Sequence, residues 1–182
     1  MFRKIPTQIR IPGPVEGRME YVKYGQGEDD LFEGIKYTDF IYDTDKDDES
    51  FYQFWCLIPP DYRKYFLLSL MSINRDILPH TDSNVRTVLN FYLTAGGYVT
   101  SFCSPLAGSQ SFKLPTQTDG VVYNFEDVSM DEGFVAKDGD IYLLDVSKLH
   151  CVHSGKGNRV ALNLGTVLPY NEVVDILTKA ED

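Results

Sequence analysis

Between residues 66 and 167 the chain alternates short apolar runs with turn-forming residues, and this pattern restricts the possible folds more than any other feature. Turn signals such as Ala95-Gly96-Gly97 and Asp138-Gly139 separate the runs. Many short strands with turns between them predict a β-sandwich or barrel. The predicted strands span residues 66–73, 87–93, 98–103, 121–125, 133–136, 141–144, 149–152 and 159–167.

The flanking segments are less regular. Residues 1–45 contain short β-like runs at 8–11 and 40–42, separated by glycine and proline. Residues 65–68 are compatible with either a second helix or the start of the first strand. At the other end, residues 171–178 predict a capped helix with one apolar face.

The acidic stretch over residues 43–49 is predicted to be a solvated loop that caps a short helix over about 48–55. Pro59 and Pro60 would end that helix. A calcium loop is the alternative, but the glycine and terminal glutamate of an EF-hand are not at their places.

The chain has 182 residues, which suggests one domain with a sizeable core. We expect a single domain over residues 1–182. It would comprise an N-terminal elaboration (1–60), a β core (66–168) and a C-terminal helix (170–182).

Charge and composition exclude several classes of protein. Acidic residues outnumber basic ones 27 to 17, for a net charge of −10, and no basic run is present. This composition disfavours a nucleic acid as a partner, because proteins bind phosphates with lysine and arginine. No apolar run reaches the ~20 residues of a membrane span. No serine or cysteine lies in a nucleophile-elbow context, which disfavours hydrolase chemistry.

The N-terminus lacks the apolar core of a signal peptide. The three cysteines, at 56, 103 and 151, have spacings that indicate neither a disulfide framework nor a zinc clip. We expect a cytoplasmic, reducing environment.

All three histidines lie in two short segments. His80 and Asp82 are in Leu-Pro-His-Thr-Asp, and His150 and His153 flank Cys-Val. Residues two apart on a strand face the same way, so His80 and Asp82 are expected on one side. Two imidazoles and one carboxylate cover one face of an octahedral Fe(II) and leave the other positions open.

The second segment favours His150 over His153 as the ligand. Gly139, Asp145 and Ser147 precede His150 at the spacing of the second cupin motif, although that motif has proline and glycine where Asp145 and Ser147 stand. His153 lies six residues before Arg159, which leaves little chain for a turn and a return strand. We therefore interpret His153 as a polar turn residue, or one that lines the substrate entrance.

Cys151 alternates away from His150, and this indicates a buried structural thiol.

Arg159 follows His150 by nine residues, and Ala161 and Asn163 share its face of the predicted strand. A buried guanidinium is costly unless it meets an anion, and a dicarboxylate would bind it through two oxygens.

Asn90 and Tyr92 share a face of the strand after the first histidine segment. They are candidates for hydrogen bonds to a cosubstrate, and Tyr92 is equally suited to core packing. Arg86 suits either a substrate carboxylate or the surface.

The motif His80-x-Asp82, a gap of 67 residues, His150 and then Arg159 resemble the Fe(II)/2-oxoglutarate-dependent dioxygenase superfamily. Pro79-His80-Thr81-Asp82 followed by Val85-Arg86, together with Gly139–Asp145 leading into Leu149–Val152, looks most like the aspartyl/asparaginyl β-hydroxylase and amino-acid (proline) hydroxylase branch. The resemblance extends over about residues 66–168. Some aspartyl hydroxylases have glycine at the position of Asp82, so this chain has the fuller ligand set.

The resemblance implies a mainly β, double-stranded β-helix (a cupin-like jelly roll) with a few flanking helices. It also implies that His80, Asp82 and His150 bind Fe(II), and that 2-oxoglutarate chelates the metal and pairs its far carboxylate with Arg159. The implied reaction uses O₂ to hydroxylate an amino-acid-like substrate, either a free amino acid or a peptide, and releases succinate and CO₂.

Two other classes of function remain open. One is a cupin-type metal enzyme that does not use 2-oxoglutarate, in which Arg159 has no assigned role. The other is a non-catalytic jelly-roll binding module with incidental histidines. The oligomeric state is left open as well.

Overall fold

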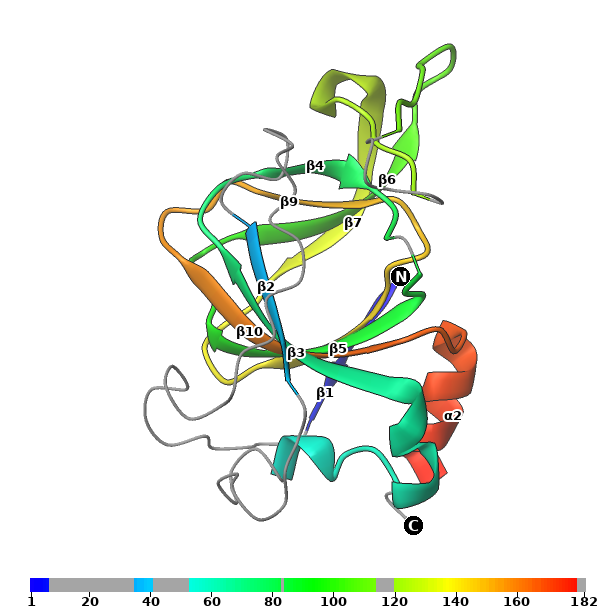
Figure 1. The fold of residues 1–182 in the computed structure, drawn as a ribbon. Coiled ribbons are helices and arrows are strands. Elements are labelled where there is room, and N and C mark those ends of the chain that lie inside the picture. Colours follow the sequence, from blue (N-terminus) through cyan, green and yellow to red (C-terminus); the bar gives the residue numbers. More distant parts are fainter. Residues whose placement is uncertain (7–34, 41–52, 83, 114–119, 180–182) are drawn as a thin grey trace.

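Two antiparallel sheets dominate the computed structural model, which describes residues 1–6, 35–40, 53–82, 84–113 and 120–179 (Figure 1). The larger sheet has the strand order β1-β8-β5-β10-β3-β2, and the smaller sheet has the order β4-β9-β6-β7. The strands are β1 (Phe2–Ile5), β2 (Ile35–Phe40), β3 (Phe66–Ile73), β4 (Ile77–His80), β5 (Thr87–Thr94), β6 (Val99–Pro105), β7 (Val128–Val135), β8 (Ile141–Asp145), β9 (His150–His153) and β10 (Arg159–Thr166).

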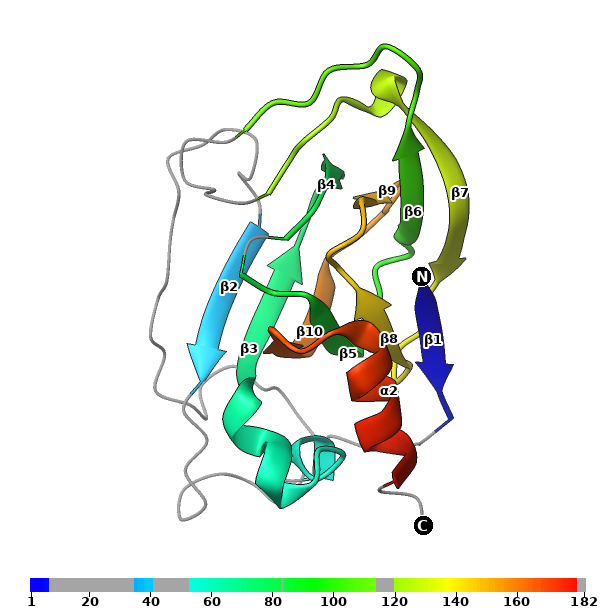
Figure 2. The ribbon, with the colours of Figure 1, turned by 90° about the vertical axis from the view of Figure 1, so that its right-hand side faces the viewer.

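Strands β3 to β10 form the jelly roll that the sequence predicts. Along this stretch the chain changes sheet at every connection except the β6–β7 hairpin. Each sheet thus receives four of these eight strands, and the two sheets face one another (Figure 2). The prediction of a mainly β, cupin-like fold with few helices is confirmed.

The four central strands of the larger sheet, β3, β5, β8 and β10, are buried on both faces, which explains why they are apolar almost throughout. Leu89, Leu143 and Leu162 point to its outer face, where they pack against the C-terminal helix α2 (Tyr170–Lys179) and residues around Phe54. Alternate residues on the same strands, such as Tyr92, point between the sheets.

The smaller sheet also has a covered outer face. Residues 121–128 cross it, and Val121, Tyr123 and Phe125 pack onto Cys103 and Cys151 there. The smaller sheet therefore separates two environments, the inner layer and this outer cluster.

Most predicted strands lie within one or two residues of the observed ones. The segment 65–68, for which helix and strand were both open, begins β3, and a 3-10 helix (Pro60–Tyr65) precedes it. The strand predicted at 133–136 starts earlier, at Val128, because the whole segment pairs with β6.

The predicted strand at 121–125 is wrong. Only Val122 forms bridges, to Phe112 and to His80, and a 3-10 helix occupies Phe125–Asp127. The backbone pairs only briefly with the end of β4, through Val121 and Tyr123, and the apolar side chains there cover the outer face of the smaller sheet. An apolar run of this length is equally compatible with a paired strand and with a segment whose side chains cover a sheet face.

Several expectations for the N-terminal third fall outside the described residues. These include the runs at 8–11 and 41–42, the acidic loop at 43–49 and most of the helix at 48–55, of which only residues 53–55 are described, as helix. In the part of the chain that is described, none of the helices has the length and apolar character needed to cross a membrane.

Candidate metal centre

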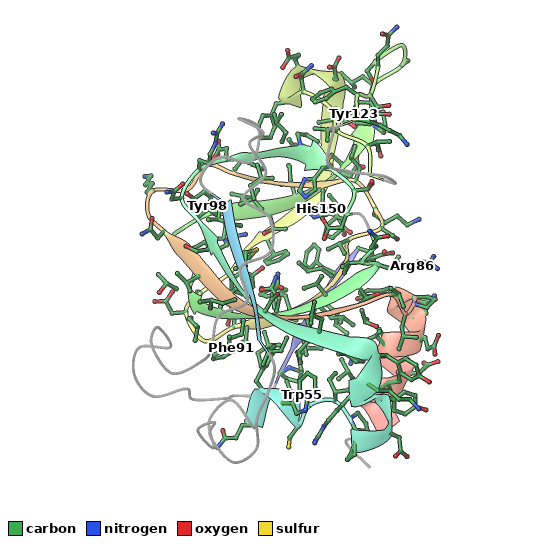
Figure 3. All side chains as sticks on the ribbon, viewed as in Figure 1. Trp55, Arg86, Phe91, Tyr98, Tyr123 and His150 are labelled. Atoms are coloured by element: carbon green, nitrogen blue, oxygen red, sulfur yellow. The ribbon has the colours of Figure 1, made fainter. Side chains whose placement is uncertain are left out.

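Strand register brings His80 and His150 together, although 70 positions separate them. The two residues are direct partners on the antiparallel strands β4 and β9. Directly opposed residues have Cβ atoms about 5 Å apart, and the two rings lie 4.5 Å apart between centroids. His150 points into the layer between the sheets (Figure 3). It shares its face of β9 with Val152 and contacts Phe102, and both of these residues belong to the inner cluster.

Asp82 completes the group from just beyond the end of β4. The backbone N–H of Asp82 donates to the Val146 carbonyl, and the Thr81 N–H donates to the Val121 carbonyl, both at 3.1 Å. These bonds hold the segment so that Asp82 Oδ1 lies 3.2 Å from His80 Nε2 and 3.9 Å from His150 Nε2. The ligand atoms of the three residues all lie within 4.8 Å of one another.

The orientation of each imidazole is set by the backbone. His80 Nδ1 lies 2.7 Å from the Leu78 carbonyl and His150 Nδ1 lies 2.9 Å from the Lys148 carbonyl. A carbonyl only accepts, so Nδ1 is the donor in both rings and Nε2 is the atom left to bind a metal. Metal-ligating histidines commonly donate their other nitrogen in this way.

The electrostatics of the group are those of a cation site. Burial lowers the pKa of His150 to about 4, and the neighbouring His80 adds to the effect. Burial also opposes the charged form of His80, but hydrogen bonding and attraction to Asp82 outweigh it and raise its pKa. The same contacts lower the pKa of Asp82 despite its burial. The shifts of His80 and Asp82 both reflect their 3.2 Å contact, and a cation that binds there competes with a proton for His80 Nε2.

Arg159 is 1% exposed at the start of β10 and packs between two tyrosine rings. Its guanidinium carbon lies 5.2 Å from the ring centroids of both Tyr92 and Tyr98. It donates to Thr100 Oγ1 at 2.9 Å, to the Tyr98 carbonyl at 2.8 Å and, weakly, to the Ala95 carbonyl at 3.5 Å. Burial lowers its pKa.

No carboxylate of the described residues forms a salt bridge with Arg159. Because arginine has five N–H groups and three are engaged, two remain for a ligand. A buried guanidinium held only by neutral acceptors is the environment that an anionic ligand would complete.

Two buried amides lie side by side on the inner face of the larger sheet. Asn90 on β5 and Asn163 on β10 are direct register partners and are 5% and 7% exposed. Asn90 Nδ2 donates to the Tyr92 hydroxyl at 3.4 Å, and Asn163 Nδ2 faces the Met71 sulfur at 3.8 Å.

Neither amide oxygen has a partner within the described structure. Exchanging oxygen and nitrogen in either amide would leave the nitrogen unpaired instead, so each amide retains one unused polar atom. Buried polar atoms normally have partners, so this pair is a candidate contact for a bound ligand.

The remaining predicted site residues lie apart from the histidine pair. His153 is on the opposite face of β9, where Nε2 is 2.9 Å from Ser101 Oγ and the ring contacts Phe125. Arg86 is exposed at the periphery, in the connection between β4 and β5 (Figure 3). Cys151 is buried on the outer face of β9, as alternation from His150 predicts.

Sequence reasoning assigned no role to Asn163, Thr100 or Tyr98. Alternation along the strand already placed Asn163 on the same face as Arg159. Its polar side chain in an otherwise apolar strand could have identified it as a site residue. Thr100 and Tyr98 carried no such signal, because they reach Arg159 from β6 and the turn before it.

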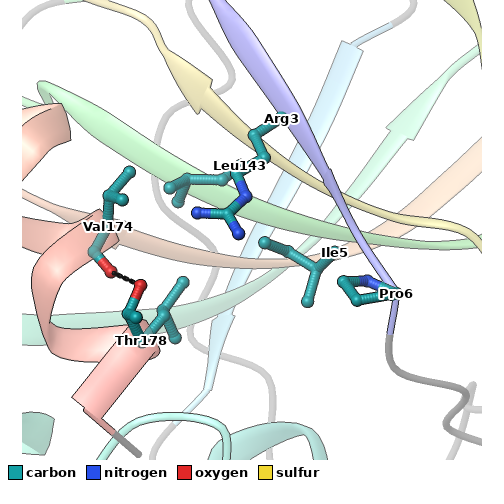
Figure 4. Close-up of a pocket in the computed structure, with 7 residues that line it drawn as sticks. Arg3, Ile5, Pro6, Leu143, Val174 and Thr178 are labelled. Carbon is teal, nitrogen blue, oxygen red and sulfur yellow. Dashed lines mark hydrogen bonds between the residues drawn. The ribbon is translucent and has the colours of Figure 1, made fainter. Parts of the chain in front are cut away.

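A pocket between β1 and α2 is unrelated to the histidine group. Arg3, Ile5, Leu143 and Val174 contribute to its lining (Figure 4). Ile5, Leu143 and Val174 belong to the layer outside the larger sheet, so that sheet separates this pocket from the inner layer.

Comparison with known proteins adds little to this geometry. No protein-family model matches the chain, and no curated protein matches it either. Among solved structures, the chain is similar to HygX from Streptomyces hygroscopicus, whose structure has nickel and 2-oxoglutarate bound. Identity is 13% and the TM-score is 0.40, over 81% of this chain and 73% of HygX. Similarity at this level does not assign an activity.

Proposed function

We propose that the protein is an Fe(II)- and 2-oxoglutarate-dependent dioxygenase that hydroxylates an amino-acid-like substrate. The observation that carries the proposal is the convergence of two imidazole Nε2 atoms and one carboxylate within 4.8 Å, with both Nδ1 atoms tied to backbone carbonyls. Three protein ligands of this kind suit non-haem Fe(II) and leave positions open for a cosubstrate and O₂.

In this proposal His80, Asp82 and His150 hold the metal. The carbonyls of Leu78 and Lys148 keep both rings oriented, so the site needs little rearrangement when the ion arrives. Any proton that His80 Nε2 carries has to leave before this atom becomes a ligand.

Arg159 would bind the distal carboxylate of 2-oxoglutarate through its two unengaged N–H groups. Thr100 and Tyr98 hold the guanidinium in place, and the ring of Tyr92 shields it from water. The unpaired amide atoms of Asn90, which the sequence suggested as a cosubstrate contact, and of Asn163 provide further polar contacts. A buried cation and two incompletely paired amides fit a ligand that carries carboxylates.

When bound together, Fe(II), 2-oxoglutarate and O₂ supply the oxidising chemistry, which hydroxylates a substrate C–H bond and releases succinate and CO₂. The apolar layer around Phe102 excludes water from the histidine pair. The substrate would be a free amino acid or a peptide side chain, and the net charge of −10 favours cationic or neutral molecules. Arg86, which is exposed in the connection between β4 and β5, is the candidate substrate contact, whereas His153 lies on the outer face of β9, away from the histidine pair.

The test is anaerobic addition of Fe(II) and 2-oxoglutarate, followed by visible absorption. We expect a charge-transfer band for the wild type, and its loss in His80→Ala. His153→Ala is the matched control, because that histidine lies on the opposite face of β9 and should leave the band intact. A wild type without a band, or a His80→Ala variant with an undiminished one, contradicts the proposal.

Arg159→Ala distinguishes the proposed reaction from a cupin-type metal enzyme that does not use 2-oxoglutarate. We expect Fe(II) binding to be retained and 2-oxoglutarate affinity to fall at least ~100-fold, which corresponds to about 2.7 kcal/mol for a charge-assisted pair. Arg86→Ala is the matched arginine control for cosubstrate binding. A wild type that binds Fe(II) but not 2-oxoglutarate favours the cupin-type enzyme, and an unchanged affinity in Arg159→Ala means that the arginine does not contact the cosubstrate. A wild type that binds no metal favours the non-catalytic module. Succinate release across pools of amino acids and peptides then identifies the substrate.

A further inference from the structure

Three sulfur atoms gather on the outer face of the smaller sheet, one each from β6, β7 and β9. Cys103 on β6 is the direct register partner of Met130 on β7. The Cys151 thiol on β9 lies 3.7 Å from the Met130 thioether, and Cys103 and Cys151 belong to the same buried cluster. All three side chains are therefore neighbours in space, although the chain brings them from three strands.

A β-bulge creates this arrangement. Phe102 pairs with Glu132 whereas Cys103 pairs with Met130, so Asp131 is the extra residue on β7. In a regular ladder Cys103 would face Asp131. The bulge replaces that carboxylate with a thioether opposite the thiol. The Asp131 carboxylate turns instead to the hydroxyls of Ser104 and Ser129.

The surroundings of the sulfur atoms are apolar and are open on one side. Cys151 is fully buried and Cys103 is 8% exposed, whereas Met130 is 45% exposed. Val128 and Leu149 form the walls next to the two thiols. A small ion would reach the thiols past the flexible Met130 side chain.

We propose that Cys103, Met130 and Cys151 form a trigonal binding site for a soft monovalent metal ion of the Cu(I) class. Thiolate and thioether ligands select such ions over hard cations. Metal–sulfur bonds of about 2.3 Å place the sulfur atoms of a trigonal site about 4 Å apart, close to the 3.7 Å between Cys151 and Met130. Three sulfur donors also suit a low-coordinate ion better than Zn²⁺, which takes four ligands.

This site is independent of the proposed dioxygenase centre. Cys151 follows His150 directly but points to the other face of β9, and the sheet itself lies between the two groups. Loss of the proposed iron ligands should leave the sulfur site intact, and the two proposals therefore fail separately.

The experiment uses Ag(I) as a redox-inert probe, titrated anaerobically into the full-length protein with calorimetric detection. Cys56→Ser serves as the parent, because it removes the exposed cysteine and leaves only the two buried ones. We expect one Ag(I) per chain in the parent, no comparable binding after a second change of Cys103→Ser or Cys151→Ser, and at least ~10-fold weaker binding with Met130→Leu. His80→Ala in the parent should bind as the parent does.

X-ray absorption at the silver edge gives a readout that does not depend on how the cysteine variants fold. Three sulfur neighbours in the parent and two in the Met130→Leu variant support the site, since Met130 is largely exposed and its change to leucine is conservative. No bound Ag(I) in the parent, or an affinity and sulfur count unaffected by Met130→Leu, overturns the three-sulfur site.

Discussion

Asn163→Leu should stabilise the metal-free protein while weakening cosubstrate binding. Asn163 is 7% exposed, its amide oxygen has no partner in the described structure, and its NH₂ group faces only the Met71 sulfur at 3.8 Å. Leucine has nearly the same size and carries no polar atom. The substitution therefore removes an unpaired group without opening a cavity.

The magnitude follows from the cost of that unpaired atom. A buried acceptor without a hydrogen bond costs about 1–3 kcal/mol, and the sulfur contact offsets little of this. We expect the free energy of unfolding to rise by about 1 kcal/mol, and the Tm by roughly 2–4 °C in a chain of this length. In the wild type, 2-oxoglutarate at about 100 times its Kd would add about 2.7 kcal/mol. In Asn163→Leu this increment should shrink.

The assay is thermal unfolding of the metal-free protein, repeated with Mn(II) and 2-oxoglutarate. Leu164→Ala is the control, since Leu164 is fully buried on the other face of β10. It should lose about 2–5 kcal/mol of stability and keep the full ligand increment. If Asn163→Leu is destabilising, the amide has a partner such as a buried water, and the reasoning is refuted. If it is stabilising but keeps the full increment, Asn163 does not contact the ligand.

Three other predictions concern the residues around the two sites. Gly155→Ala should weaken 2-oxoglutarate binding, measured by calorimetry, because a Cβ at this position overlaps the ring of Tyr98, which packs against Arg159. Gly157→Ala is the control and should bind like the wild type, because a Cβ there meets only ordinary contacts. Arg159→Lys should restore less than half of the binding energy lost in an alanine variant, because lysine cannot form the planar two-point contact, and full rescue would argue for a simple charge effect. The pKa of His150 falls from 6.5 to about 4 on folding, so the unfolded chain takes up a proton first as pH drops, and the free energy of unfolding declines between about pH 6.5 and 4. In His150→Gln, urea unfolding at a series of pH values should show a smaller decline over this range. An equal decline in the variant would assign the effect to other groups.

Local sequence pattern was sufficient to predict most of the core. The strand over 66–73 was predicted with its observed bounds, because an apolar run between turn residues has few alternatives at that length. The run at 121–125 was predicted as a strand and is wrong, since its apolar side chains cover a sheet face that the pattern alone does not reveal. Strand β4 was not predicted, because four residues that include a proline give a weak signal.

For the candidate site, the spacing of residues in the sequence indicated which residues belong together, but it did not indicate how their strands pair. Residue types and intervals suggested that His80, Asp82 and His150 belong together, and the structure brings these three side chains within reach of one ion. The choice between His150 and His153 was made from spacing, and alternation along β9 places the two on opposite faces. Whether these residues bind iron stays a prediction.

The sequence by itself determined which segments form strands and which chemical groups are available, because both depend on neighbours along the chain. Only the tertiary structure decided that Asn90 faces Asn163, that Arg159 is held by neutral acceptors, and that a bulge turns Met130 toward Cys103. The reason is physical: pairing across strands is set by register and bulges between segments distant in sequence, and a shift of one residue exchanges the two faces of a strand.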